Sequence, residues 1–188
     1  MSGHNKWSQI KERKGKTDAQ KSKVFGKYAK LITVEAKKAG GNRNSPGLKA
    51  IVDRAKAENM PNDNIERAIK RATESKTALE SITYEAYGPG GCAMIIEALT
   101  DNRNKAAQEV KFILSQHGYA LAAQGSASWA FERHDTNTPI DANNTNNYEK
   151  FKPTTTVPLS DEDLSALEKL VDALEANDEV QAVYTNAE

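Results

Sequence analysis

The sequence predicts an α+β protein: an N-terminal three-helix bundle followed by a ferredoxin-like (split βαβ) antiparallel-sheet domain. Up to residue 75, apolar residues recur every three to four positions, which is typical of amphipathic helices. Beyond residue 76, apolar runs and helical patterns follow the order of two β-α-β units. The charge also changes sign, because residues 1–71 carry 18 Lys and Arg against 7 Asp and Glu, whereas residues 72–188 carry 8 against 19.

The chain divides into three segments. Residues 1–16 form a basic arm in which, apart from Met1, Trp7 and Ile10 are the only large apolar side chains. Such a segment buries little surface by itself, so we expect docking of Trp7 to order it in part. Residues 17–75 form the helical domain. Residues 76–188 form the ferredoxin-like domain, which contains a disordered loop.

Three helical patterns make up the helical domain. The first covers residues 17–39 and ends at Gly40-Gly41, because glycine readily adopts the backbone conformation that ends a helix. Pro46, at a first helical position, opens the second pattern, and Asn59-Met60-Pro61 ends it. The third pattern follows directly. Since each helix has one apolar face, we expect the three to pack as a small bundle.

Alternating residues 82–87 indicate an additional hairpin strand, which precedes the first β-α-β unit. A glycine-rich turn leads to the apolar strand 92–99, the amphipathic helix 104–117 and the strand 126–132. The second unit follows an Asn- and Thr-rich stretch at 135–152, which contains too little apolar surface to fold and predicts a disordered loop.

This second unit begins with a short strand at 154–158. A helix follows, with Ser160 as its N-cap and five apolar residues along one face. The last strand covers 180–184. We expect both units to share one antiparallel sheet with the helices on one face.

No pattern indicates an enzyme. The histidines His4, His117 and His134 lie far apart and lack metal-ligand spacing. Cys92 is the single cysteine, which excludes a disulfide within the chain. The turn Gly88-Pro89-Gly90-Gly91 precedes a strand, whereas a phosphate loop precedes a helix. We therefore expect no catalytic residue, no metal, no cofactor and no small-molecule substrate.

Two further features indicate a cytoplasmic location with no membrane partner. No apolar run approaches the roughly 18 residues that a membrane span needs. The first residues also lack the apolar core of a secretory signal.

The basic residues of the first part predict a nucleic-acid interface. Lys23, Lys27 and Lys30 are spaced by four and three, so they share one face of the first helix. Phosphate binding needs such cations on a rigid frame, because affinity comes largely from released counterions. Trp7 would stack on a base. The candidate contact residues are Lys6, Trp7, Lys11, Arg13, Lys14, Lys16, Lys23, Lys27, Lys30, Arg67, Lys70 and Arg71.

Long stretches of the sequence resemble the YebC/PmpR family, which includes the mitochondrial translational activator of cytochrome oxidase. The matching stretches are GHNKWSQIK at 3–11, NMPNDNIERAIKR at 59–71, YEAYGPGG at 84–91, LTDNRN at 99–104 and VDALEANDEVQ at 171–181. The resemblance implies a cytoplasmic, non-enzymatic regulator with a helical first domain. Typical members carry a further α/β domain after the strand that matches residues 128–131. Here the loop at 135–152 takes its place, which makes the chain a short variant.

Three hypotheses about function stay open. The family resemblance favours a transcriptional regulatory protein that binds DNA. The lysine-rich arm, and the lack of a helix with Arg, Asn and Gln at base-reading positions, favour a ribosome-associated translation factor that binds ribosomal RNA. The third hypothesis is a protein-interaction adaptor that acts through the acidic α/β domain. The expected partner is thus DNA or ribosomal RNA, with the ribosome in the second case.

Overall fold

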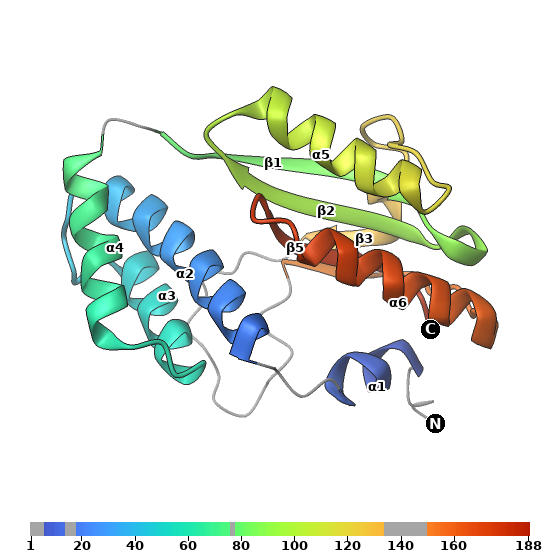
Figure 1. Cartoon of the computed structure of the whole chain (residues 1–188), viewed down its shortest axis with the longest axis horizontal. Coiled ribbons are helices and arrows are strands. Elements are labelled where there is room, and N and C mark those ends of the chain that lie inside the picture. The colour runs from blue at the N-terminus through green and yellow to red at the C-terminus, as the bar shows by residue number, and fades with distance from the viewer. Residues whose placement is uncertain (1–5, 14–17, 76–77, 134–149) are drawn as a thin grey trace. The chain divides into compact units, whose positions relative to one another are not determined.

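The structure, a computed structural model, describes residues 6–13, 18–75, 78–133 and 150–188 (Figure 1). The chain divides into two compact units, and each is described by itself. The helical unit covers the described residues up to Glu80 that follow residue 17. The α/β unit combines residues 6–13 with 81–133 and 150–188.

The helical unit contains three helices, as the sequence predicts. They are α2 (Asp18–Lys38), α3 (Pro46–Ala57) and α4 (Asn62–Glu74), which lie side by side in Figure 1. Gly40 and Gly41 follow α2 with positive φ angles of 57° and 81°, a conformation that glycine adopts without strain. The apolar faces meet in one core of Ile32, Ala36, Leu48, Ala55, Met60, Ile65, Ala68, Ile69 and Ala72.

Helices α2 and α4 run in the same direction and end together. The Thr33 hydroxyl donates to the Ala68 carbonyl at 3.3 Å, and one turn later Lys37 Nζ donates to the Ser75 carbonyl at 3.3 Å. The second bond lies nearer the C-terminus of both helices than the first, so the two helices are parallel. Helices α2 and α4 therefore pack against each other in parallel.

The main sheet of the α/β unit contains β1 (Glu80–Tyr87), β2 (Ala93–Thr100) and β5 (Val180–Thr185), in the order β1-β2-β5. Strands β2 and β5 are antiparallel. Helices α5 (Arg103–Gln116) and α6 (Asp161–Glu175) lie on the same face of this sheet (Figure 1). Arrangement of both helices on one face agrees with the expectation from the sequence.

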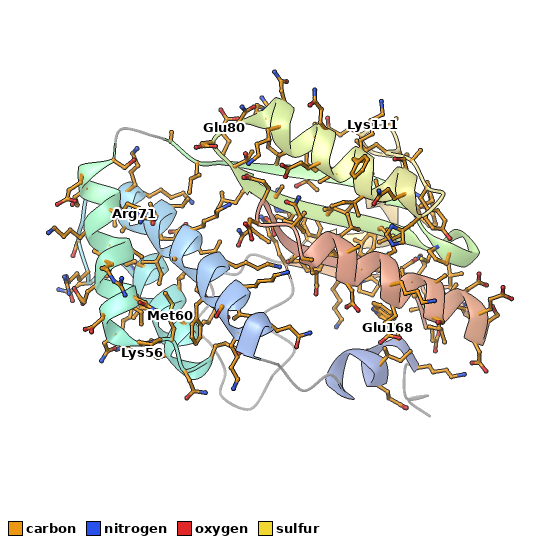
Figure 2. The ribbon with its side chains drawn as sticks, in the orientation of Figure 1. Lys56, Met60, Arg71, Glu80, Lys111 and Glu168 are labelled. Carbon is orange, nitrogen blue, oxygen red and sulfur yellow. The ribbon has the colours of Figure 1, made fainter. Side chains whose placement is uncertain are left out.

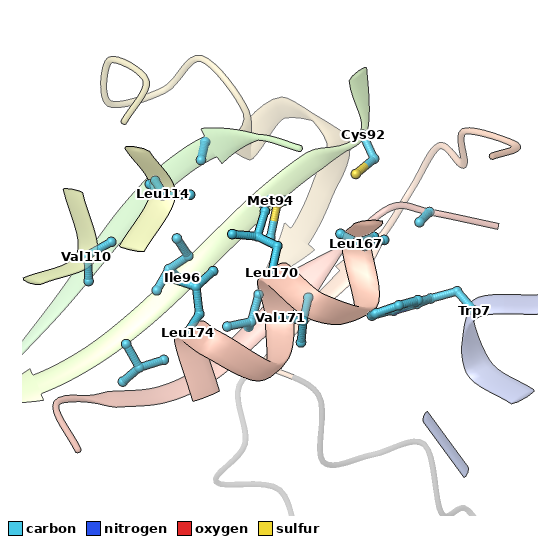
Figure 3. Close-up of a cluster of buried hydrophobic side chains, with 14 of the residues drawn as sticks. Trp7, Cys92, Met94, Ile96, Val110, Leu114, Leu167, Leu170, Val171 and Leu174 are labelled. Carbon is cyan, nitrogen blue, oxygen red and sulfur yellow. The ribbon is translucent and has the colours of Figure 1, made fainter. Parts of the chain in front are cut away.

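The core of this unit lies between the sheet and the two helices (Figure 3). The expected N-cap of α6 is present, since the Asp163 amide donates to Ser160 Oγ at 3.1 Å. The sheet and the two helices enclose a layer of buried apolar side chains. Its buried members include Met94 and Ile96 from β2, Val110 and Leu114 from α5, and Leu164, Leu167, Leu170, Val171 and Leu174 from α6.

The expectation of one shared sheet is wrong among the described residues. Strands β3 (Phe131–Arg133) and β4 (Phe151–Pro153) pair antiparallel with each other as a separate two-stranded sheet. The strand expected at 126–132 starts only at Phe131, because Ser128–Ala130 forms the 3-10 turn η2, which buries Ala127 and Ala130. These two alanines pack with Ala93 and Ile95 in a small core of their own.

The loop and strand expected between residues 135 and 158 also need correction. Residues 135–149 of the expected loop lie outside the described residues, but Phe151–Pro153 is strand β4, so the expected loop does not extend beyond residue 150. The strand expected at 154–158 does not form. Only Val157 makes an isolated parallel bridge, with Ala187.

The basic arm is not a separate element. Residues Lys6–Arg13 form helix α1, which belongs to the α/β unit. Trp7 is only 5% exposed and reaches α6 beside Leu167 and Val171 (Figure 3). Docking of Trp7 therefore agrees with the expectation. Its expected stacking on a base is wrong, because burying a large indole in the core is favourable and leaves no ring face for a ligand.

Candidate nucleic-acid interface

The first part of the candidate site is the outward face of α2. Lys23 is exposed, and Lys27 and Lys30 are partly exposed. Each residue of a helix turns by about 100°, so these three lysines lie opposite the fully buried Ile32 and Ala36. Because Ile32 and Ala36 pack into the core, the three lysines are held on the solvent side of α2. A row of cations on one rigid helix can follow a chain of phosphates.

The second part is the outward face of α4. Arg67 and Arg71 are exposed and one turn apart, opposite the buried Ile65 and Ile69. Figure 2 shows the Arg71 side chain extending from α4. Arg67 bonds within its own helix: Nε donates to the Asp63 carbonyl at 3.3 Å, and its terminal nitrogen donates to the side chain of Asn64. These bonds reduce the donors with which Arg67 could read a base edge.

A shallow hollow of about 410 Å³ lies between α4 and the turn that precedes α3. Its lining residues are Gly41, Arg43, Glu66, Arg67, Ile69, Lys70 and Thr73. Arg43 and Glu66 form a two-pronged ion pair across it, with N–O distances of 2.7 and 2.5 Å. This hydrogen-bonded pair raises the pKa of Arg43 and lowers that of Glu66. Lys70 Nζ lies 3.7 Å from Glu74, so the cations of the hollow are partly neutralised.

Six of the twelve candidate residues are not among those that the structure places on these two helix faces, and Trp7 is one of them. Lys6 belongs to α1 and pairs with Asp161 at the start of α6, which lowers the pKa of that carboxyl through a hydrogen bond. Lys11 and Arg13 are also in α1, and their side chains are outside the described set. Lys14 and Lys16 lie outside the described residues altogether. The structure thus places Lys23, Lys27 and Lys30 on one face of α2, and Arg67, Lys70 and Arg71 at exposed positions of α4 in the same helical unit.

Two cations of the helical unit, Arg43 beside the hollow and Lys37 at the end of α2, are absent from the candidate residues named from the sequence. Arg43 borders the hollow through its pairing with Glu66, which is 23 residues away in the chain and not linked to it by any periodic pattern. Lys37 donates to the carbonyl of Ser75, the C-cap residue of α4. Its position in the last turn of α2 was the available signal, because cations favour helix C-termini.

Other kinds of site find no geometric support in the described part of the chain. No group of three or more His, Cys, Asp and Glu side chains there is arranged to hold a metal ion. Burial raises the pKa of the Cys92 thiol, as in a packed side chain rather than a nucleophile. None of the described helices combines the length and the apolar character that crossing a membrane requires.

Comparison with known proteins assigns the family. The N-terminal domain of TACO1/YebC proteins matches residues 5–75, and the second and third domain of these proteins matches residues 79–150 and 136–187. The chain belongs to the TACO1/YebC family. The family resemblance noted in the sequence is thereby confirmed.

Relatives of this TACO1/YebC protein match it over 71% to 100% of its length. It is 37% identical over 239 aligned positions to a probable transcriptional regulatory protein of Thermoanaerobacter pseudethanolicus, covering 100% of this chain and 97% of that protein. It is 52% identical over 136 residues to one of Thermotoga maritima, covering 71% of this chain and 54% of that protein. The crystal structure of the conserved hypothetical protein Aq1575 from Aquifex aeolicus has a TM-score of 0.79 at 32% identity, covering 97% of this chain and 96% of that one.

This TACO1/YebC protein is shorter than such relatives. The alignment with the Thermoanaerobacter protein is 239 positions long, which is 51 more than the 188 residues present here. The two ranges matched to the second and third domain overlap at residues 136–150. Residues 136–150 lie within the Asn- and Thr-rich stretch at 135–152, where the sequence predicts a loop in place of a further α/β domain.

Proposed function

We propose that this chain is a non-enzymatic regulator of gene expression that binds nucleic acid through its helical unit. The observation that carries the proposal is the row of Lys23, Lys27 and Lys30 on the outward face of α2, and exposed Arg71 on α4, which packs against α2, adds a further cation to the same unit. Relatives of 37% and 52% identity are named as probable transcriptional regulatory proteins. The first target that we propose is therefore DNA.

A second candidate target is ribosomal RNA. It is favoured by the chemistry of the cationic surface, in which lysines predominate on α2 and the guanidinium groups of Arg43 and Arg67 are bonded to neighbouring side chains. Base reading in the major groove relies on forked donors such as Arg, whereas lysines act as point charges toward phosphates. A surface of this kind suits a partner recognised by its backbone.

Binding to duplex DNA tests the first candidate. Fluorescence anisotropy should compare a promoter duplex with a random duplex of the same length at one salt concentration. A transcriptional regulator is expected to prefer the promoter by at least about 1,000-fold. A ratio near one would reject sequence-specific DNA binding and leave backbone binding in place.

Co-sedimentation with ribosomes tests the second candidate. The intact chain should sediment with ribosomes at low salt, and the double variant Lys23→Gln/Lys27→Gln should sediment less. The matched control is Lys111→Gln/Lys169→Gln, which removes two exposed lysines from α5 and α6 of the α/β unit. If the intact chain stays in the supernatant at low salt, the ribosomal candidate is wrong.

A further inference from the structure

Two exposed aromatic side chains of the α/β unit are joined to each other. Trp129 in η2 is 62% exposed, and Tyr87 at the end of β1 is 38% exposed. The indole Nε1 donates to the Tyr87 hydroxyl at 3.1 Å, and that hydroxyl donates to the carbonyl of Ser126. Both polar atoms are thus used inside the protein. What the pair offers to a partner is aromatic ring surface.

A buried carboxylate holds the segment that presents Trp129. Glu85 is only 6% exposed and accepts hydrogen bonds from the amides of Gly125, Ala127 and Ser128 at 2.7, 2.7 and 2.9 Å. The residue after Trp129, Ala130, is fully buried, as is Ala127. The backbone on both sides of Trp129 is therefore anchored while its side chain points outward, an arrangement that core packing does not require.

The charges near the pair favour an anionic occupant. The described segments 119–133 and 150–159, which contain Trp129 and the paired strands β3 and β4, hold Arg133, Lys150 and Lys152 against Glu132, and Lys150 forms an ion pair with Glu97 of β2. Helix α6 on the other side of the main sheet holds six acids and one lysine. The segments around the aromatic pair thus carry a small excess of positive charge, whereas α6 is strongly acidic.

We propose that the Tyr87–Trp129 pair is a stacking site for an unpaired base of single-stranded nucleic acid. The proposal rests on the function proposed above and adds a second contact, made to a base rather than to phosphates. An exposed aromatic ring stacks on any base, because every base has a π-face. Bases in a duplex are already stacked on one another, so the pair discriminates in favour of single strands. The indole N–H and the phenol are occupied, so the site is tolerant of base identity.

The test compares Trp129→Ala with Phe112→Ala. Phe112 on α5 is 61% exposed, so its removal matches that of Trp129 in size and exposure but lies outside the proposed site. The ligands are a short oligouridylate, an abasic phosphodiester chain of the same length, and a duplex. Trp129→Ala should weaken oligouridylate binding about tenfold and leave the other two ligands unchanged. Phe112→Ala should change none, and Trp129→Phe should restore most of the loss.

Fluorescence gives a second readout in the intact chain. Oligouridylate should quench the exposed Trp129, whereas the abasic chain should not, and Trp7 is buried and unaffected. Unchanged affinity of Trp129→Ala for oligouridylate would overturn the proposal, as would an equal loss for the abasic chain. Either result would leave a protein as the occupant of the pair. Failure of the proposed function gives a different result. Lys23→Gln/Lys27→Gln would then bind all three ligands as tightly as the intact chain, while Trp129→Ala would still weaken oligouridylate binding.

Discussion

Replacement of Glu85 by Gln keeps the shape of the side chain and removes its charge. The carboxylate accepts three backbone N–H donors from the segment that leads to Trp129. A glutamine offers one carbonyl oxygen, and its NH2 group would face a backbone N–H. We expect the segment that Glu85 organises to loosen while the sheet and its two helices stay folded.

The size of the effect follows from these bonds. A hydrogen bond to a charged group contributes about 1.5–3 kcal/mol net, and a buried donor that loses its partner costs about 1–3 kcal/mol. The amide of Ala127 is buried, whereas those of Gly125 and Ser128 are partly buried and can bond to water. We therefore expect Glu85→Gln to lower the free energy of unfolding by about 3 kcal/mol.

The effect should depend on pH. Burial by itself would raise the pKa of Glu85, but the bonds from the three amides outweigh it and hold the pKa below its ordinary value of 4.5. A carboxyl with a lowered folded pKa stabilises the protein fully above its unfolded pKa, and that contribution is lost as the pH falls through the folded value. The difference between the intact chain and Glu85→Gln should thus be constant above pH 4.5 and shrink below it.

Urea unfolding followed by tryptophan fluorescence measures this difference. Both tryptophans, Trp7 and Trp129, lie in the α/β unit, so the signal reports on that unit. Glu132→Gln, at an exposed position of β3, is the control for removal of one negative charge and should leave the midpoint unchanged. Equal midpoints for Glu85→Gln and the intact chain at neutral pH would refute the reasoning.

Four further substitutions have expected effects on unfolding by urea. Trp7→Ala should destabilise the α/β unit by about 3–5 kcal/mol, and Ile32→Ala should destabilise the helical unit by about 2–5 kcal/mol, because both side chains are buried. An unchanged midpoint would contradict that burial. Gly90→Ala should cost about 1–2 kcal/mol or more, since φ is 63° and a Cβ would overlap Leu159. Gly26→Ala should stabilise α2 by about 0.5–1 kcal/mol, because no other atom lies within 4 Å of the position that the new Cβ would occupy. A lower free energy of unfolding for Gly26→Ala would contradict the open position of Gly26 on α2.

Local patterns predicted the helices well. Residues 17–39 and 104–117 were expected as helices, and α2 and α5 cover 18–38 and 103–116. Periodicity, glycine stops and a serine cap act over a few residues, so the chain displays them directly. The three-lysine face of α2 was predictable for the same reason, because it depends only on spacing and on which face is apolar.

Long-range contacts were not predictable in this way. The separate β3–β4 sheet, the bonds from Glu85 to amides about 40 residues away and the Arg43–Glu66 pair all join distant parts of the chain. Trp7 is the clearest case. Among basic neighbours its sequence context suggested stacking on a base, and only the packing of α1 against α6 reveals that it belongs to the core.

The salt dependence of nucleic-acid binding tests the central claim most directly. Each lysine that neutralises a phosphate contributes about 0.9 to the slope of log affinity against log salt concentration. Lys23→Gln/Lys27→Gln should therefore reduce the magnitude of the slope by about 2, and Lys111→Gln/Lys169→Gln should leave it unchanged. Equal slopes for the two double variants would contradict binding through the lysine face of α2.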